Sequence, residues 1–260
     1  MIEVCDKVRI GKIFIDAMSC RQLLEQLDRM VKNKSFSYVC FCDSNLYMLA
    51  TLRTDVCQIL KNATLVLPDG ISIKLTARLL GQKISYRLPG PATMLEYCRH
   101  GAKSGLRHFF YGAAPGVVEQ LTLNFCREIP GIRIVGTYTP PFRQLTSQEE
   151  LDVKKQIEQS GADVLWVGLG APKQELWMAE HVGKIDVPLM LGVGAAFDFH
   201  SGNRRWAPPW IRKAGLEWVY RMFTGGKRVF WRNLRCVTLS SLIMAREIML
   251  SHLGLAQHNK

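Results

Sequence analysis

The hydrophobic positions of the chain alternate between short apolar runs and longer stretches of helical periodicity. Six apolar runs predict strands at 36–41, 65–67, 108–111, 132–137, 164–167 and 188–193. The segments between them repeat their apolar positions at helical spacing, for example at 20–33, 71–80 and 147–159. A further edge strand or hairpin is predicted at 8–15. Apolar strands that alternate with helices are typical of a parallel sheet covered on both faces, so the sequence predicts a Rossmann-like α/β fold.

The positive charge of the chain is concentrated after residue 203. Residues 204–247 supply eight of the twelve excess positive charges, and aromatic residues are interleaved with the basic ones. Lys227, Trp231 and Arg235 follow one another at i, i+4, so a helix there has an aromatic and basic face. Such a face suits an anionic membrane or a single-stranded nucleic acid, or is simply solvated. We therefore expect a nearly neutral body followed by a basic helical appendage.

Composition excludes several classes of protein. Of 260 residues, 48% are hydrophobic and 22% are charged, which is typical of a globular chain rather than a disordered one. No two of the eight cysteines have CxxC spacing, so zinc and dithiol redox motifs are not indicated. No apolar run approaches the ~20 residues of a membrane-spanning helix. Residues 1–12 carry charges where a signal peptide needs an apolar core, so we expect a cytoplasmic protein.

One carboxylate lies between the end of a predicted strand and the start of a predicted helix. The apolar run 65–67 is followed by Pro68, Asp69 and Gly70, and helical spacing resumes at Ile71. In open α/β sheets the carboxyl ends of the strands face the ligand crevice, so Asp69 is a candidate general base. The alternative is that Asp69 caps the helix that follows it.

Three strands of the second half end in loops of small residues. These loops contain Gly112, then Gly168 and Gly170, and then Gly194. Small residues allow backbone N–H groups and helix N-termini to approach a phosphate, so a nucleotide site is predicted here; close packing of the loops is the alternative. None of the loops is a complete GxGxxG, because Lys173 occupies the third glycine position of the second one.

Polar side chains follow two of these loops. Gln174 and Glu175 lie in the first turn of a predicted helix, and Asp198 stands between two phenylalanines. Asp198 suits ribose hydroxyls, by analogy with the acidic residue of dinucleotide folds. The alternatives are ordinary helix-start chemistry for Glu175 and a solvated loop for Asp198. The sequence has no Asp-x-Asp, and its histidines show no metal-ligand spacing, so we expect no metal site.

Several motifs, in this order, resemble those of the WecG/TagA/CpsF glycosyltransferases. They are LPDG at 67–70, GLGAPKQE at 168–175, GVGAAFD at 192–198, and Ser201-Gly202 with RWAP at 205–208. The resemblance implies an inverting hexosyltransferase of cell-surface polysaccharide biosynthesis. It would move a sugar of the N-acetylmannosamine type, or a related hexose, from a UDP-sugar to a polyprenyl-diphosphate-linked sugar. It also implies that no metal or other cofactor is needed, which agrees with the missing Asp-x-Asp.

The resemblance assigns roles to individual residues. Asp69 matches the presumed catalytic base, and Arg87 matches an arginine near the donor or acceptor phosphates. Gln174, with Glu175 beside it, matches the glutamine of the substrate pocket. Asp198 matches the aspartate that meets the nucleotide, next to the glycine loops and Lys173.

Asn45 matches the asparagine of a Thr-x-Asn motif, but here the threonine position holds Asp43. We expect both side chains to line the substrate pocket. The departure at Asp43 is a candidate mark of a different donor sugar or acceptor.

The resemblance also divides the chain into parts. Residues 1–202 would form the catalytic domain, with the acceptor and base side at about 1–100 and the nucleotide-sugar side at about 101–202. Residues 203–260 would close the active site at the inner face of the cytoplasmic membrane. Because the acceptor is lipid-linked, we expect the basic appendage to bind a membrane rather than a nucleic acid. Self-association is left open. The candidate membrane or phosphate contacts are Arg205, Arg221, Lys227, Arg228, Arg232 and Arg235.

The chemistry sets one further expectation. Asp has an ordinary pKa of ~3.9 and is then a weak base, so we expect burial or a nearby phosphate to raise the pKa of Asp69. Two other functions stay open. The missing third glycine disfavours an NAD(P)-dependent oxidoreductase, and a non-catalytic nucleotide- or nucleic-acid-binding protein gives no reason for Asp69 beside a polar pocket.

Overall fold

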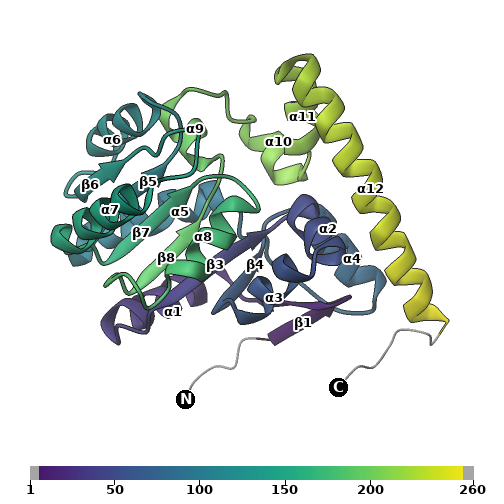
Figure 1. The fold of residues 1–260 in the computed structure, drawn as a ribbon. Coiled ribbons are helices and arrows are strands. Elements are labelled where there is room, and N and C mark those ends of the chain that lie inside the picture. Colours follow the sequence, from purple (N-terminus) through teal and green to yellow (C-terminus); the bar gives the residue numbers. More distant parts are fainter. Residues whose placement is uncertain (1–5, 254–260) are drawn as a thin grey trace.

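The computed structural model describes residues 6–253 and, at positions 228, 229 and 232, the backbone only (Figure 1). The strands in that range are β1 (Asp6–Ile10), β2 (Ile13–Ala17), β3 (Ser37–Cys42), β4 (Leu65–Pro68), β5 (Arg107–Gly112), β6 (Arg133–Tyr138), β7 (Val164–Gly168) and β8 (Leu189–Gly192). The helices are α1 (Cys20–Lys32), α2 (Ser44–Leu52), α3 (Thr54–Asn62), α4 (Ile71–Leu79), α5 (Gly90–Ser104), α6 (Val117–Glu128), α7 (Ser147–Ser160), α8 (Lys173–His181), α9 (Ala196–Ser201), α10 (Pro209–Ala214), α11 (Glu217–Thr224) and α12 (Gly226–His252).

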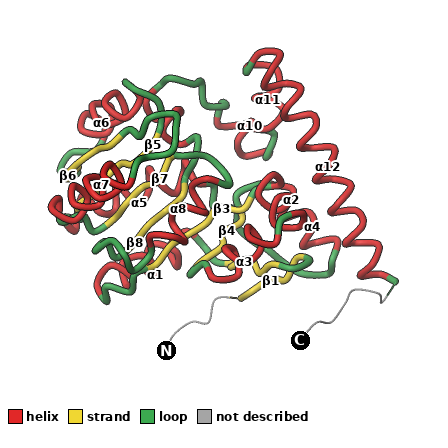
Figure 2. Tube along the Cα trace, in the orientation of Figure 1, coloured by secondary structure: helices red, strands yellow, loops and turns green. Residues whose placement is uncertain are grey.

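Six strands form one parallel sheet in the order β4-β3-β8-β7-β5-β6, with helices on both faces (Figure 2). The predicted Rossmann-like fold is therefore confirmed. The chain fills the sheet in two parts, β3 and β4 on one side and β5 to β8 on the other, which meet where β3 pairs with β8. Because all six strands run in the same direction, their carboxyl ends meet at one edge.

The sheet separates two hydrophobic cores. One face packs against α1, α5 and α6 and includes Phe41 and Trp166. The other face packs against α2, α3, α4, α7 and α8 and includes Cys40 and Cys42. Successive residues of a strand point to opposite faces, which explains why the two cysteines and Phe41 belong to different cores. The buried thiols serve as small apolar side chains here.

The predicted hairpin forms by pairing of β1 with β2, and it covers the outer edge of β4. The buried Asp16 carboxylate accepts a hydrogen bond from the Val66 backbone N–H over 2.7 Å. A side chain of the hairpin thus satisfies an edge N–H of β4, a strand with which β2 is in contact but not paired. This contact fixes the strand that leads to Asp69.

The basic appendage is helical, as predicted. Helix α12 lies along α2 and α4 on one side of the body, and α10 and α11 lie near the carboxyl edge of the sheet (Figure 1). Met244 of α12 is buried in the same core as α2 and α4. Among residues 6–253, no helix combines the length and the apolar character needed to cross a membrane.

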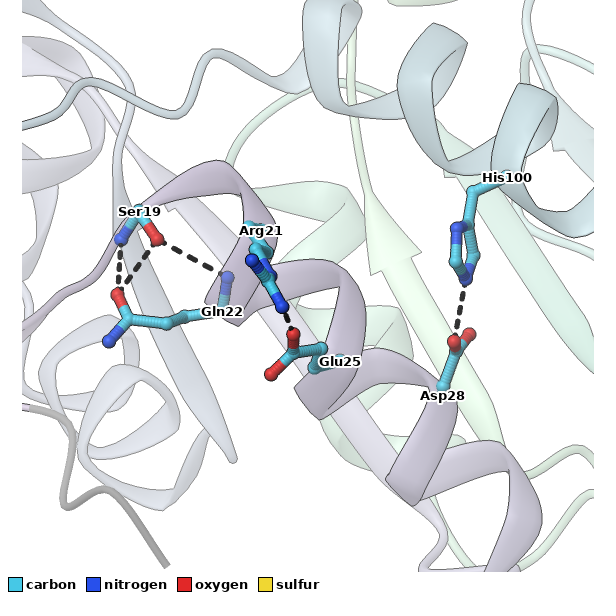
Figure 3. Close-up of polar contacts among 6 residues, drawn as sticks. All are labelled: Ser19, Arg21, Gln22, Glu25, Asp28 and His100. Carbon is cyan, nitrogen blue, oxygen red and sulfur yellow. Dashed lines mark hydrogen bonds and ion pairs between the residues drawn. The ribbon is translucent and has the colours of Figure 1, made fainter.

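Helix α1 begins with a capping box formed by Ser19 and Gln22 (Figure 3). The Ser19 hydroxyl accepts from the Gln22 N–H over 3.3 Å, and the Gln22 side chain accepts from the Ser19 N–H over 2.8 Å. Further along α1, Asp28 contacts His100 of α5 over 2.6 Å. The reciprocal cap satisfies two of the N–H groups that a helix start leaves without partners.

We expect Ser19→Ala to lower the free energy of unfolding by about 1 kcal/mol, because it removes this cap. Arg21→Ala is the matched control in the same turn: its ion pair with Glu25 is exposed and contributes about 0.5 kcal/mol or less. Urea denaturation measures both. Equal losses of unfolding free energy in the two variants would contradict the capping role of Ser19.

Candidate active site

Asp69 lies at the carboxyl edge of the sheet, between two neighbouring segments. Its N–H donates to the Cys42 carbonyl over 3.0 Å, which places it beside the end of β3. The Leu88 N–H donates to the Pro68 carbonyl over 2.8 Å, which brings the Arg87 segment to the same turn. The topology thus gathers residues from three parts of the first half around one carboxylate.

The capping alternative for Asp69 is wrong. Helix α4 begins at Ile71, its N-cap residue is Gly70, and no side chain caps it. No described residue donates a hydrogen bond to the Asp69 carboxylate. The carboxylate is therefore available for chemistry.

Burial is the main reason that the pKa of Asp69 rises to about 7. The Asp43 carboxylate adds to the rise, Arg221 opposes it, Glu217 adds to it, and Arg87 opposes it. The direction agrees with the expectation that burial raises this pKa. A carboxyl group with a pKa near neutrality holds a proton far more tightly than an ordinary aspartate, yet still releases it at physiological pH.

Asp43 and Asn45 lie at the start of α2, next to Asp69. The Asp43 carboxylate caps this helix by accepting from the Leu46 N–H over 2.9 Å. The Asn45 side-chain carbonyl accepts from the Cys236 thiol of α12 over 3.5 Å. Asp43 therefore has a structural role at the position where the resemblance expects threonine, and the appendage contacts Asn45.

Gln174 and Glu175 are buried beneath the same edge, with 4% and 0% of their surfaces exposed. The Gln174 amide donates to the Gly192 carbonyl and to Glu175, both over 2.8 Å, and its carbonyl accepts from the Gly170 N–H over 3.1 Å. It thereby joins the ends of β7 and β8. This role goes beyond the pocket contact expected from the sequence.

Glu175 holds one oxygen against Gln174, while its Oε2 atom has no hydrogen-bond partner among residues 6–253. Burial raises the pKa of Glu175 to about 7; the bond from Gln174 opposes the rise, and Asp43 adds to it. The role of Glu175 at the start of a helix does not by itself require its carboxyl group to be fully buried.

The small-residue loops lie next to one another, because β8, β7 and β5 are neighbours. A Cβ at Gly112 would lie 2.6 Å from the Gly168 carbonyl, and one at Gly168 would lie 2.8 Å from the Phe197 ring. Close packing thus requires these two glycines. Gly170 has open space around it, with φ of +77°, and Lys173 is exposed at the start of α8. Gly170 and Lys173 therefore leave the most room for a ligand.

Asp198 lies in α9, a short helix that the sequence pattern did not predict. Its carboxylate accepts from the Asn203 amide over 2.8 Å and pairs with Arg204 over 3.3 Å. The solvated-loop alternative is therefore wrong. The carboxylate holds the chain segment that leaves the body for the appendage.

Arg87 contacts the appendage directly. Its guanidinium donates to the Arg212 carbonyl over 2.6 Å and lies 3.9 Å from the Glu217 carboxylate. Arg212 in turn stacks on Trp206, with its guanidinium carbon 3.9 Å from the ring centre. The sequence reasoning missed Arg212 and Glu217. Glu217 is one of only two acidic residues between 204 and 247, which was the available signal.

The predicted basic contacts divide into two groups. Arg221 is partly buried and close enough to Asp69 to affect its pKa, whereas Arg205, Lys227 and Arg235 are exposed. The side chains of Arg228 and Arg232 lie outside the described residues. In the part of the chain that the structure covers, no three metal-binding side chains come together.

The fold and site define a Rossmann-like α/β protein whose polar side chains gather at the carboxyl ends of its strands. A profile of the glycosyl transferase WecG/TagA/CpsF family matches residues 8–252. The chain belongs to this family and is a glycosyltransferase of the kind that serves polysaccharide synthesis.

Curated relatives have a common name, N-acetylglucosaminyldiphosphoundecaprenol N-acetyl-beta-D-mannosaminyltransferase. The chain is 29% identical to the one from Bacillus subtilis (strain 168) over 193 residues, which are 74% of this chain and 73% of the relative. It is 25% identical to the one from Staphylococcus aureus (strain NCTC 8325) over 225 residues, covering 86% and 87% respectively.

We expect Asp69→Asn to stabilise the protein at pH 8. Folding raises the pKa of this group from 3.8 to about 7, so the folded chain binds the proton more tightly than the unfolded chain. Its contribution to the free energy of unfolding therefore falls as the pH rises between those values. The advantage of the variant should grow by about 2–3 kcal/mol from pH 5 to pH 8.

Urea denaturation at the two pH values measures this advantage, with Asp186→Asn at an exposed position as the control. The same pH dependence in wild type and Asp69→Asn would show that Asp69 ionises like an ordinary aspartate.

Proposed function

We propose that the protein transfers a sugar of the N-acetylmannosamine type from a UDP-sugar to a polyprenyl-diphosphate-linked sugar, with inversion and without a metal ion. The names of its relatives support the class of sugar and of acceptor. Asp69 carries the proposal, because it is a partly buried carboxylate that neither caps a helix nor accepts a hydrogen bond from a described residue.

Asp69 would act as the general base. The acceptor hydroxyl oxygen attacks C1 of the donor sugar while its proton passes to the Asp69 carboxylate. The bond from C1 to the diphosphate oxygen breaks on the opposite face, and UDP leaves with the electron pair. A base with a pKa near the working pH is the most effective kind, and such groups contribute roughly 10²–10⁴-fold to the rate.

The departing diphosphate needs positive charge and N–H donors. Arg87 and Arg221 lie close enough to Asp69 to lower its pKa, so both are near the reacting centre. Guanidinium groups match phosphate oxygens in a two-point geometry. The open loop at Gly170 and the N-terminus of α8 with Lys173 would hold the nucleotide phosphates. Asp198 would reach the ribose by exchanging its contacts with Asn203 or Arg204.

The substrate pocket would be formed by Asp43 and Asn45 from α2 together with the buried Gln174 and Glu175. Asp43 affects the pKa of both Asp69 and Glu175, so the three carboxyl groups share one region. A carboxylate at position 43 accepts hydrogen bonds only, whereas threonine also donates one. This difference would alter which sugar hydroxyls the site binds.

The appendage would bring the site to a lipid-linked acceptor at the inner face of the cytoplasmic membrane. Trp210, Phe223 and Trp231 are exposed, and so are Lys227 and Arg235. Exposed aromatic and basic side chains together suit the headgroup layer of an anionic bilayer. The lack of a spanning helix among the described residues leaves surface attachment as the proposed mode.

We expect UDP and a subset of UDP-sugars to raise the thermal midpoint of the purified protein without added metal, because a ligand that binds only the folded state stabilises it. Asp69→Asn should still be stabilised by UDP but should lose at least about 100-fold in transfer to a lipid-linked acceptor. GDP and NAD are the control ligands. Stabilisation by NAD alone would overturn the proposal in favour of an oxidoreductase.

Vesicle flotation tests the membrane surface. The double variant Lys227→Glu, Arg235→Glu should bind vesicles of phosphatidylglycerol clearly more weakly than wild type, since each basic residue contributes about 1 kcal/mol at such a surface. Lys32→Glu, Lys103→Glu makes the same change of net charge on α1 and α5 and should bind like wild type. Equal weakening by both pairs would point to a nonspecific effect of net charge.

A further inference from the structure

The first turn of α11 is brought to the Asp69 turn by close backbone packing. A Cβ at Gly215 would lie 2.7 Å from the Ile71 Cβ, and Gly215 has a φ of +73°. Both facts favour glycine at this position. The appendage backbone therefore touches the residue that begins α4, two positions after Asp69, and α11 begins at Glu217, two positions after the glycine.

Glu217 and Arg87 face each other across this contact. Their charged groups are 3.9 Å apart, and only 18% and 16% of the two side chains are exposed. Arg87 is also fixed by the Arg212 carbonyl of the appendage at 2.6 Å. Charges that are largely withdrawn from water interact more strongly than surface charges, so Glu217 acts on the site at short range.

Among the side chains that the structure describes, four charged groups affect the protonation of Asp69. Asp43 comes from the start of α2, and Arg87 comes from the segment after α4. Glu217 and Arg221 both come from α11, one turn apart and on the same face. The site thus combines two acidic neighbours with two basic ones, and the appendage supplies one of each.

We propose that Glu217 is a positioning residue of the active site, which holds Arg87 beside the Asp69 turn from the appendage side. This inference rests on the proposed function of Asp69 as the base. The arginines that would stabilise the departing diphosphate also favour the ionised form of Asp69 and so weaken it as a base. A carboxylate on the same helix as Arg221 offsets that effect. The full strength of the base then depends on a docked appendage.

The test is the pH dependence of transfer by the full-length protein. In Glu217→Gln, the midpoint of the acidic limb should move to lower pH by about 0.5 unit or more, because a negative neighbour of Asp69 is lost. Arg221→Gln should move it to higher pH. Glu217→Asp keeps the charge and should restore the wild-type midpoint, which a loss of packing alone would not explain.

Glu247→Gln is the matched control, since it removes the same charge from α12 at a position that faces Tyr47. It should leave the midpoint unchanged. If the wild-type enzyme is active and Glu217→Gln has the same midpoint as the wild type, the inference is overturned and the proposed function stays intact. Absence of transfer in the wild type would overturn the proposed function instead. Carbon NMR of the Asp69 carboxyl group gives the same midpoints without transfer activity. The inference about Glu217 can therefore be tested whether or not the wild type is active.

Discussion

The partial burial of the Asp69 carboxyl group is the constraint on which the candidate site depends. Desolvation is the largest cause of its raised pKa, and the neighbouring charges modify that effect rather than create it. The desolvation has a structural origin. The Asp69 turn is bonded to the end of β3 on one side and to the Arg87 segment on the other, while Gly215 closes over Ile71 from the appendage.

The appendage is consequently part of the site as well as a surface element. Helix α12 reaches Asn45 through Cys236, α10 supplies the carbonyl that fixes Arg87, and α11 places Glu217 and Arg221 near Asp69. If Asp69 is the base, as proposed, the stability lost by burying its carboxyl group is exchanged for activity, which is common at enzyme sites. The exposed aromatic and basic side chains lie on the same helices, so membrane attachment and completion of the site would be coupled.

The fold could be predicted from the sequence because apolar strands and periodic helices each need a buried face, and only a covered parallel sheet satisfies both. Asp69 and the glycine loops could be predicted because strand ends meet at one edge. The capping role of Asp43 and the hydrogen bonds by which Gln174 joins the ends of β7 and β8 could not be predicted. Both depend on side-chain directions that the spacing of residues does not fix. Glu217 was missed because its rarity among basic residues does not identify Arg87, the partner that it faces.

The most direct measurement of the central claim is a titration of the Asp69 carboxyl group in the full-length protein. Carbon NMR of aspartate-labelled wild type, compared with Asp69→Asn to identify the signal, gives the midpoint without any substrate. We expect a midpoint near pH 7, as burial dictates. A midpoint near the ordinary value of ~3.9 would show that water solvates this carboxylate freely. Asp69 would then lack the basicity on which the proposed mechanism depends.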